Sequence, residues 1–280
     1  MNTNKPNEVE KNSDEIIADR AKHLQIIKNG FGGNPNPVQL PLWEESLRGI
    51  PNEIVRCSLF NARNRAIKRR YFEDEPMFVI GETKVHYRGE ELRQDDEIVW
   101  MQVLHLARIH LLNELVKFVP ASFMKALGWK SRGQENYERL RKILSRLQAT
   151  AVSFSVKRSD SSVSVSLIRR FECHDLGKWQ VWIEPEMKIL FPEDYYSLIK
   201  WQQRLDLPSG IASKLHSYYA SHKEPYPIRV ENVKNLCGST GSLDDFREKM
   251  LEALEHLKAI QFLNQYWIDQ NDLLHVKRTH

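Results

Sequence analysis

At 280 residues, with 41% hydrophobic and 28% charged residues, the chain has the length and composition of a globular protein with two domains. Its 41 Lys and Arg against 37 Asp and Glu leave a net charge of only +4, so a nucleic-acid partner has to be argued from a local basic face. The polar start, the lack of a long apolar run and three scattered cysteines exclude a signal peptide, a membrane span and a disulfide framework, and we expect a cytoplasmic protein with no membrane partner.

The N-terminal region reads as a flexible tail over residues 1–53. Residues 1–37 are polar and poor in large apolar groups, apart from a candidate helix over residues 14–28. The segment Gln39-Leu40-Pro41-Leu42-Trp43 then follows a Gly/Pro-rich linker. Its apolar side chains suit either the first contact with a core or an extended peptide that enters a partner's pocket, and the pattern alone favours the core.

The next stretch combines strands with a buried helix. Residues 54–60 are rich in β-branched and aromatic side chains and predict a strand. Residues 77–80 and 84–87 predict a hairpin. Asp95 and Asp96 precede a long apolar pattern that predicts a buried helix over residues 97–115.

A helix-turn-helix pattern follows. A short helix over residues 120–128 ends at a glycine, and the next helix has Leu140, Ile143, Leu144 and Leu147 at i, i+3, i+4 and i+7 with basic residues on its other side. Residues 151–156 and 162–167 alternate as in a hairpin. This order predicts a winged helix, although an ordinary surface helix would also carry a charged face. We place the first winged-helix domain at residues 54–175.

The second half of the chain repeats this plan, and we place a second winged-helix DNA-binding domain at residues 176–280. The expected elements are a strand over 179–183, a helix over 209–221, a strand over 226–230, a helix over 232–236, a long helix from Ser242 and a hairpin around 269–272. Ser242 and Asp245 form a capping-box pattern. The long helix is mainly acidic, which disfavours contact with phosphate. The expected fold class is therefore α+β, with two tandem winged-helix domains behind the tail.

The candidate DNA contacts follow from the basic face. Those expected to hold phosphates are Lys130, Arg132, Arg139, Lys142 and Arg146. Gln134 and Asn136 have the side chains that read adenine, Arg132 also suits guanine, and Glu138 suits cytosine. Tyr137 lies on the same stretch. In the second domain the candidates are Lys234, Arg247 and Lys249.

No arrangement in the sequence demands catalysis. The histidines include no His-x-His pair for a nickase metal site, and Gln134-Glu135 stand where a phosphate loop from Gly128 to Gly133 would need Lys-Ser/Thr. His105 and His110 fall on the predicted buried helix, where packing is the more common role. We expect a protein that is not an enzyme and has no metal or cofactor.

Four motifs in order carry a resemblance to a known family. They are Arg56–Arg65, Gly89–Asp96, Leu144–Ala151 and Ser221–Pro227, and with the sequence around them, over residues 39–278, they resemble the TrfA family of plasmid replication initiators. The resemblance implies tandem winged helices that bind direct repeats (iterons) in double-stranded origin DNA. It also implies opening of adjacent AT-rich DNA with the host initiator ATPase and recruitment of the host replicative helicase.

For the 39–43 segment, the resemblance reverses the preference given by the apolar pattern and favours a partner-binding peptide over a contact with the core. Members of the family bind the host sliding clamp through a Gln-Leu-x-Leu-aromatic peptide, which Gln39, Leu40, Leu42 and Trp43 match, with Trp43 where Phe is usual. Between Gly128 and Leu144 the match weakens, which suggests a different iteron sequence. The family also implies self-dimerisation. The alternative function is a winged-helix transcriptional repressor, which needs the same DNA face but no clamp peptide.

Overall fold

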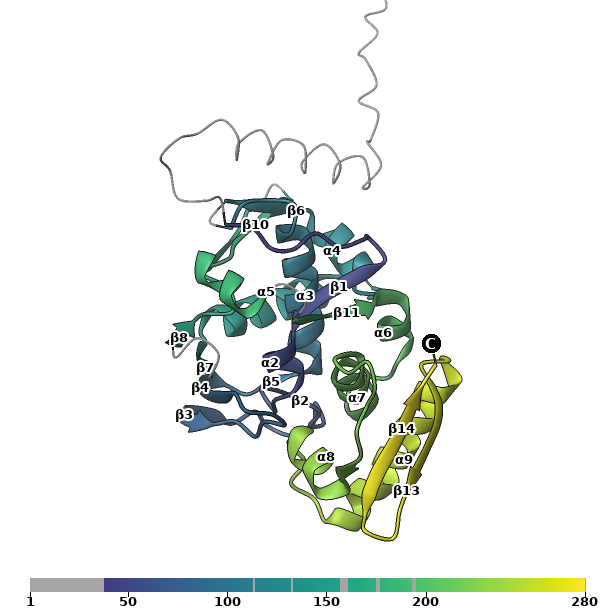
Figure 1. Cartoon of the computed structure of the whole chain (residues 1–280). Coiled ribbons are helices and arrows are strands. Elements are labelled where there is room, and N and C mark those ends of the chain that lie inside the picture. Colours follow the sequence, from purple (N-terminus) through teal and green to yellow (C-terminus); the bar gives the residue numbers. More distant parts are fainter. Residues whose placement is uncertain are drawn as a thin grey trace, which may run out of the picture.

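The computed structural model describes residues 38–279, apart from positions 113, 132, 157–160, 175–176 and 193–194. The tail expected over residues 1–37 and the candidate contact Arg132 lie outside the described residues. The described part is a mixed α/β protein with two hydrophobic cores (Figure 1). The first core is formed by residues between Leu40 and Trp201, and the second by residues between Leu207 and Val276.

We call residues 38–201 the first unit and residues 207–279 the second unit. The first unit contains, in chain order, β1 (Leu47–Pro51), α2 (Asn52–Val55), β2 (Phe60–Asn61), β3 (Tyr71–Pro76), β4 (Lys84–Glu90), β5 (Leu92–Arg93), α3 (Gln94–Ala107), β6 (Val116–Phe118), α4 (Pro120–Ala126), α5 (Gln134–Gln148), β7 (Ala151–Val156), β8 (Ser161–Val165), β9 (Arg170–Cys173), β10 (Trp179–Trp182), the 3-10 helix η1 (Pro185–Leu190) and β11 (Tyr196–Lys200). Helix α6 (Trp201–Asp206) joins the units. The second unit contains α7 (Ile211–Ala220), β12 (Ile228–Arg229), α8 (Val230–Leu236), α9 (Leu243–Ala259), β13 (Leu263–Ile268) and β14 (Leu273–Arg278).

Helix α3 is the centre of the first unit. Val99, Trp100, Val103 and Leu104 are fully buried, and α3 packs against β1, α5 and the short parallel pair β2 and β5. An antiparallel sheet with the order β3-β4-β7-β8 and a second one with the order β6-β10-β9 complete the unit. An apolar pattern around most of a helix predicts such burial, because no face of the helix is left for water.

The second unit follows the order helix, short strand, two helices, hairpin. Its three strands pair in the order β12-β14-β13, and α9 buries Phe246, Met250 and Leu254 beneath them. The hydroxyl of Ser242 accepts a 3.1 Å hydrogen bond from the backbone N–H of Asp245, which confirms the predicted cap at the start of α9.

The two units meet through a buried polar contact. Helix α7 packs against α9 on one side and against α2 and β11 on the other, as Figure 1 shows. Beside it, the Nη2 atom of Arg204 lies 3.0 Å from Oε1 of Gln94 and 3.4 Å from Oε2 of Glu97, which also accepts a 3.2 Å hydrogen bond from Ser217. Because Glu97 and Arg204 are both buried, their charges have to be satisfied by each other.

Three predicted elements are wrong. Residues 54–60 begin in α2 rather than in a strand, Cys57 forms only an isolated bridge with Val79, and strand β2 starts at Phe60. Strand β4 pairs with β3; of residues 77–80, Met77 donates a 2.8 Å backbone hydrogen bond to Val85, while Phe78, Val79 and Ile80 contact the segment from Arg56 to Ser58. Helix α3 ends at Ala107, where the chain turns so that Leu111 can form a bridge with Gln39.

The predicted domain limits also differ from the packing. Residues 38–53 belong to the first core, since β1 pairs with β11 and Ile50 is fully buried, so the tail does not extend to residue 53. The boundary expected at residues 175/176 lies between β9 and β10, which are neighbours in one sheet. The two cores are separated at α6 instead. Strand β11, just before α6, belongs to the first unit because it pairs with β1.

Candidate nucleic-acid interface

Helices α4 and α5 form the predicted pair with a glycine in the turn. Helix α4 ends just before Gly128, whose φ of +72° is the left-handed conformation that glycine adopts without strain. Helix α5 begins after Gly133, and its four predicted core residues, Leu140, Ile143, Leu144 and Leu147, are all buried. The apolar stripe therefore fixes which side of α5 faces solvent.

The exposed side of α5 carries mixed charge. Its exposed residues, which we call the α5 stripe, are Gln134, Glu135, Glu138, Arg141, Lys142 and Ser145. Lys130, in the turn before α5, is also exposed. Arg141 and Lys142 are the cations of the stripe, and they lie beyond its acidic first turn. A duplex that docks on this side therefore meets amide and carboxylate groups first and positive charge further along.

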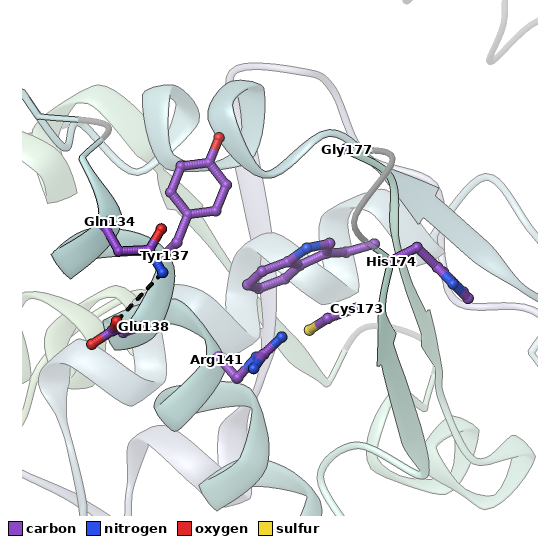
Figure 2. A pocket seen from close by; sticks show the side chains of 8 residues that line it. Gln134, Tyr137, Glu138, Arg141, Cys173, His174 and Gly177 are labelled. Atoms are coloured by element: carbon purple, nitrogen blue, oxygen red, sulfur yellow. Dashed lines mark hydrogen bonds between the residues drawn. The ribbon is translucent and has the colours of Figure 1, made fainter.

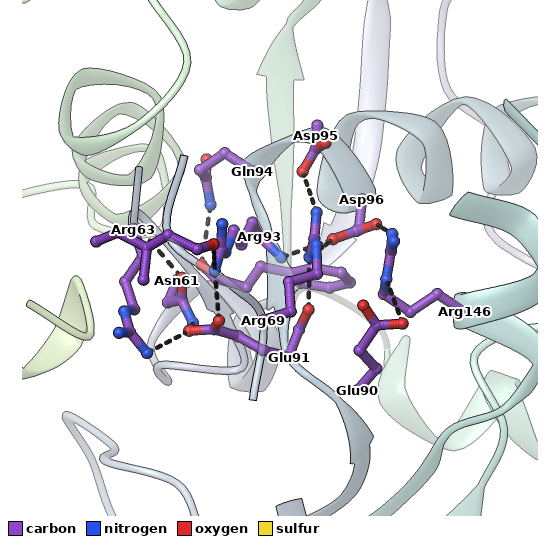
Figure 3. A network of polar contacts seen from close by, with 12 residues as sticks. Asn61, Arg63, Arg69, Glu90, Glu91, Arg93, Gln94, Asp95, Asp96 and Arg146 are labelled. Carbon is purple, nitrogen blue, oxygen red and sulfur yellow. Dashed lines mark hydrogen bonds and ion pairs between the residues drawn. The ribbon is translucent and has the colours of Figure 1, made fainter. Parts of the chain in front are cut away.

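Arg146 is not available for phosphate, although the sequence pattern puts it on the basic face. Its side chain is only 12% exposed, its Nε lies 3.2 Å from Oε2 of Glu90, and its Nη1 pairs with Asp96 (Figure 3). These two carboxylates already neutralise the guanidinium. Arg146 holds α5 to the rest of the unit instead.

Asp96 is the centre of the network in Figure 3. Its carboxylate is fully buried, accepts a 2.7 Å hydrogen bond from the backbone N–H of Arg93 and a second from Nη1 of Arg69, and pairs with Arg146. The backbone contact makes Asp96 the third helical residue of a capping box whose N-cap is Arg93, so α3 begins at Gln94 and not after Asp95 and Asp96 as predicted. One carboxylate thereby links the start of α3, the segment around Arg69 and the last turn of α5.

Arg139 is also partly occupied. Its guanidinium lies over the ring of Trp129, 4.3 Å from the centroid, and its Nη2 lies 3.9 Å from Oδ2 of Asp95. Burial, with a further contribution from the charge of Arg65, lowers the pKa of Arg139. The residue is half-buried, so only part of its charge faces solvent.

Asn136 and Tyr137 are similarly engaged. Nδ2 of Asn136 donates a 2.7 Å hydrogen bond to the carbonyl of Ser131, and the Tyr137 ring meets the Trp179 ring edge-on at 6.2 Å. Gln134 is exposed and lies 3.4 Å from Glu138, the contact drawn as a dashed line in Figure 2. Of these three candidate DNA contacts, Gln134 is the one that the fold leaves most open.

A pocket of about 330 Å³ lies beside α5, and it brings in residues that the sequence analysis missed (Figure 2). It is lined by Gln134, Tyr137, Glu138, Arg141, Cys173, His174, Gly177 and Trp179. Burial raises the pKa of the Cys173 thiol, and the neighbouring Arg141 opposes that rise. Arg141 follows Gln134 and Glu138 at helical spacing, so the solvent side opposite the leucines was the signal that could have found it.

In the second unit, α9 exposes mainly acidic residues, as the sequence indicates. Arg247 pairs with Asp244 at 3.0 Å and with Asp272 at 2.7 Å, so this candidate contact is neutralised. Lys249 is exposed among these acidic residues, and Lys234 is half-buried on α8. The exposed face of α9 therefore repels phosphate.

The hairpin β13–β14 offers a different surface in this unit. Its outward side chains are Gln265, Trp267, His275 and Lys277, since Trp267 is paired with His275 and Gln265 with Lys277 in the register. The Trp267 and His275 rings are stacked at 4.6 Å, and Nζ of Lys277 lies 5.6 Å from the Trp267 ring. The hairpin was predicted from the sequence, and the alternation of side chains along its strands is the signal that could have identified this face.

The 39–43 segment is packed in the first core. Leu40 is 2% and Trp43 4% exposed, and Nε2 of Gln39 donates a 2.8 Å hydrogen bond to the carbonyl of Arg108. The core interpretation, which the apolar pattern alone favours, matches this arrangement. The implied use of Gln39, Leu40, Leu42 and Trp43 as an accessible clamp peptide does not, because the two anchoring side chains are buried.

The described residues contain neither a metal-site cluster nor a membrane-spanning helix. No group of three or more His, Cys, Asp or Glu side chains there has the arrangement of a metal site. None of the described helices combines the length and apolar character that a membrane span requires.

Comparisons with known proteins agree with this architecture. A family model described as TrfA protein matches residues 22–278. The Plasmid replication initiator protein TrfA of Escherichia coli is 36% identical over 243 residues, which cover 84% of this chain and 63% of that protein. The chain thus spans less than two thirds of that relative.

Two crystal structures share the fold at low sequence identity. Both contain domains 2 and 3 of RctB, with TM-scores of 0.55 and 0.53 and identities of 13% and 12%. Each likeness covers 81% of this chain and 96% of the other. The fold and site define a mixed α/β protein with a helix pair and a hairpin in each of two units. With the family model matching most of its length, the chain belongs to the TrfA family, which confirms the resemblance seen in the motifs.

Proposed function

We propose that the chain is a plasmid replication initiator that binds direct repeats in double-stranded origin DNA. The observation that carries this proposal is family membership across residues 22–278, together with the name of the Escherichia coli relative. The α5 stripe supports it, because a helix held rigidly by its apolar side and by Asp96 presents its other side at fixed orientation.

Each unit acts as a winged helix in this proposal. The order α7, β12, α8, α9, β13, β14 supports that assignment for the second unit, and α3, β6, α4, α5, β7, β8 supports it for the first. A winged helix places its second helix in the major groove and its hairpin beside the backbone. Two such units on one duplex would cover successive grooves and strain the DNA between them.

The two units bind DNA differently. In the first, Lys130, Arg141 and Lys142 contact phosphates while Gln134 reads a base edge at the start of α5. In the second, the acidic face of α9 stays away from the backbone and the hairpin face with Trp267 and Lys277 makes the contact. In this mechanism the free energy of binding distorts the DNA. No covalent bond is made or broken, so the protein is not an enzyme.

Later steps involve host proteins. Bound initiators open the adjacent AT-rich DNA with the host initiator ATPase and bring in the replicative helicase. Contact with the host sliding clamp through the 39–43 segment requires that segment to leave the first core, since Leu40 and Trp43 are buried there. Self-association of the chain is a further part of this proposal.

The test is fluorescence anisotropy of the purified protein on a direct-repeat duplex from its own plasmid origin, with a scrambled duplex of equal length, across a salt series. We expect a preference for the repeats of about 10³ or more and a steep salt dependence. Equal and weak binding to both duplexes would contradict the proposal. A transcriptional repressor would share the DNA binding, so a plasmid replication assay in the host separates the two functions.

A further inference from the structure

A second cavity lies where the two units meet, away from α5. Its volume is about 230 Å³. The residues that line it come from β11, α6, α7, the turn between α9 and β13, and the end of β14 with the residue after it. They are Leu198, Lys200, Gln203, His216, Ala220, Gln261, Phe262, Arg278 and Thr279. Because both units contribute, the cavity exists only in the assembled fold.

The wall of this junction cavity contains buried nitrogen atoms without hydrogen-bond partners. Nδ1 and Nε2 of His216 and Nε of Arg278 are shielded from solvent and have no hydrogen-bond partner among the described residues. His216 is only 1% exposed, and its ring lies 4.4 Å from the Phe262 ring. Buried polar groups in folded proteins are nearly always paired, so unpaired ones indicate a missing water, ion or ligand.

The charge of the cavity has one sign. Lys200 and Arg278 line it, and neither forms an ion pair with a carboxylate in the described part of the chain. None of the described lining residues is Asp or Glu. Arg278 keeps its orientation through a 2.8 Å hydrogen bond from Nη1 to the carbonyl of His222 and through its position over the Phe262 ring. Burial lowers the pKa of His216 to about 3, and the charges of Arg204 and Arg278 contribute to this shift.

We propose that the junction cavity binds a small oxyanion of the size of phosphate. Lys200 on β11 and Arg278 on β14 supply positive charge, and the ring N–H of His216 in the lining, which has no other hydrogen-bond partner among the described residues, supplies a donor. Pockets for drug-sized ligands measure about 300–1,000 Å³, so a volume of 230 Å³ favours a single phosphate group over a nucleotide. An anion that bridges β11 and β14 would also hold the two units together.

The phosphate group has two sources, the free anion and the backbone of DNA. The proposal for the free anion does not depend on the proposed function. A protein that binds phosphate here but has no preference for direct repeats would refute the initiator role and leave the cavity assignment standing.

The experiment is isothermal titration calorimetry of the full chain with inorganic phosphate, at constant ionic strength set with sodium chloride. The variants are Lys200→Gln and His216→Phe, and the control is Lys84→Gln, which removes an exposed lysine at the start of β4 in the first unit. We expect one saturable site, weakened about tenfold in Lys200→Gln and lost in His216→Phe, with Lys84→Gln unchanged. The exposed position of Lys200 keeps that variant folded.

The absence of saturable binding, or equal affinity in Lys200→Gln and Lys84→Gln, overturns the proposal. A second arm adds the direct-repeat duplex before the phosphate titration. If phosphate no longer binds to the complex, the duplex occupies the cavity, and the natural ligand is a phosphate group of the DNA backbone. If the affinity for inorganic phosphate is unchanged in the complex, the natural ligand is the free anion.

Discussion

The indole Nε1 of Trp43 donates a 3.1 Å hydrogen bond to Nδ1 of His105 on α3. The same ring is stacked on Phe191 at 6.2 Å and lies so close to Gly49 that a Cβ there would come within 2.6 Å of it. Glycine is thus required in β1 for the ring to fit. These contacts join residues from three distant parts of the chain, and they make Trp43 part of the first core.

Trp43→Ala should therefore destabilise the protein. Loss of a buried tryptophan typically costs about 3–5 kcal/mol through lost burial and the cavity left behind. Urea denaturation of the full chain measures this change. Leu42→Ala is the matched control, because Leu42 is only half-buried and should cost less. If Trp43→Ala unfolded at the same urea concentration as the wild type, the segment would be free in solution.

The pairing of Trp43 with His105 also predicts a pH dependence. Burial lowers the pKa of His105 to about 4, so the folded state holds it neutral while the unfolded chain binds a proton below about 6.5. Stability should fall as the pH drops from about 6.5 to 4, by up to about 1.4 kcal/mol per pH unit for this one proton. The pKa of His216, lowered by burial to about 3, acts in the same direction.

His105→Gln tests this prediction, because glutamine can still accept the Trp43 hydrogen bond but does not titrate. Urea midpoints between pH 7 and pH 5 should fall less steeply for the variant than for the wild type. Glu45 does not interfere in this window: its hydrogen bond with His105, helped by Arg108, lowers its pKa to about 2. Its contribution is present above about pH 4.5 and is lost only as the pH falls towards 2. Parallel curves for the two proteins would remove His105 as the cause.

Asp96→Ala should be strongly destabilising. Asp96 is fully buried and neutralises Arg69 and Arg146, so its removal leaves buried positive charge without a partner and also removes the cap of α3. Breaking a buried pair in this way costs about 3–5 kcal/mol. Thermal and urea unfolding give the size of the loss.

Asp95→Ala is the neighbouring control for that experiment. Asp95 approaches only Arg69 at 3.0 Å and Arg139 at 3.9 Å, and it is partly exposed. It should cost clearly less than Asp96→Ala. Equal losses would mean that the network in Figure 3 has no central residue.

Arg141→Ala and Lys142→Ala should each weaken binding to all duplexes alike. A lysine or arginine that holds one phosphate contributes about one unit to the slope of log affinity against log salt. Anisotropy titrations at several salt concentrations would show each slope reduced by that amount. An unchanged slope for Arg141→Ala would exclude it as a phosphate contact, whatever the change in affinity.

Gln134→Ala should instead relax the choice of sequence. Gln134 is exposed at the first turn of α5, where a side chain reaches base edges, so its loss should narrow the gap between repeat and scrambled duplexes. The salt slope should stay as in the wild type. A uniform loss on both duplexes would point to a positioning role for Gln134.

Much of the helical structure is local and could be predicted. The stripe from Leu140 to Leu147 and the Ser242 cap are patterns within a few residues, and both are found as expected. The predicted strand at residues 54–60 and the predicted continuation of α3 beyond Ala107 are wrong for the same reason. Short apolar runs suit a strand or a helical turn equally, and the partner that decides between them is distant in sequence: Cys57 forms a bridge with Val79, and Leu111 forms one with Gln39.

The same contrast between local patterns and long-range contacts applies to the candidate site. The sequence identified the helix pair and the family, because periodicity and motif order survive without coordinates. Only the tertiary structure decided which cations are free, since Arg146 is paired with Asp96, fifty positions away, while Arg141 faces solvent. It also decided that Leu40 and Trp43 are buried, and that Lys200, His216 and Arg278 line one cavity. Charge pairing and burial depend on contacts between distant segments, and no local pattern encodes them.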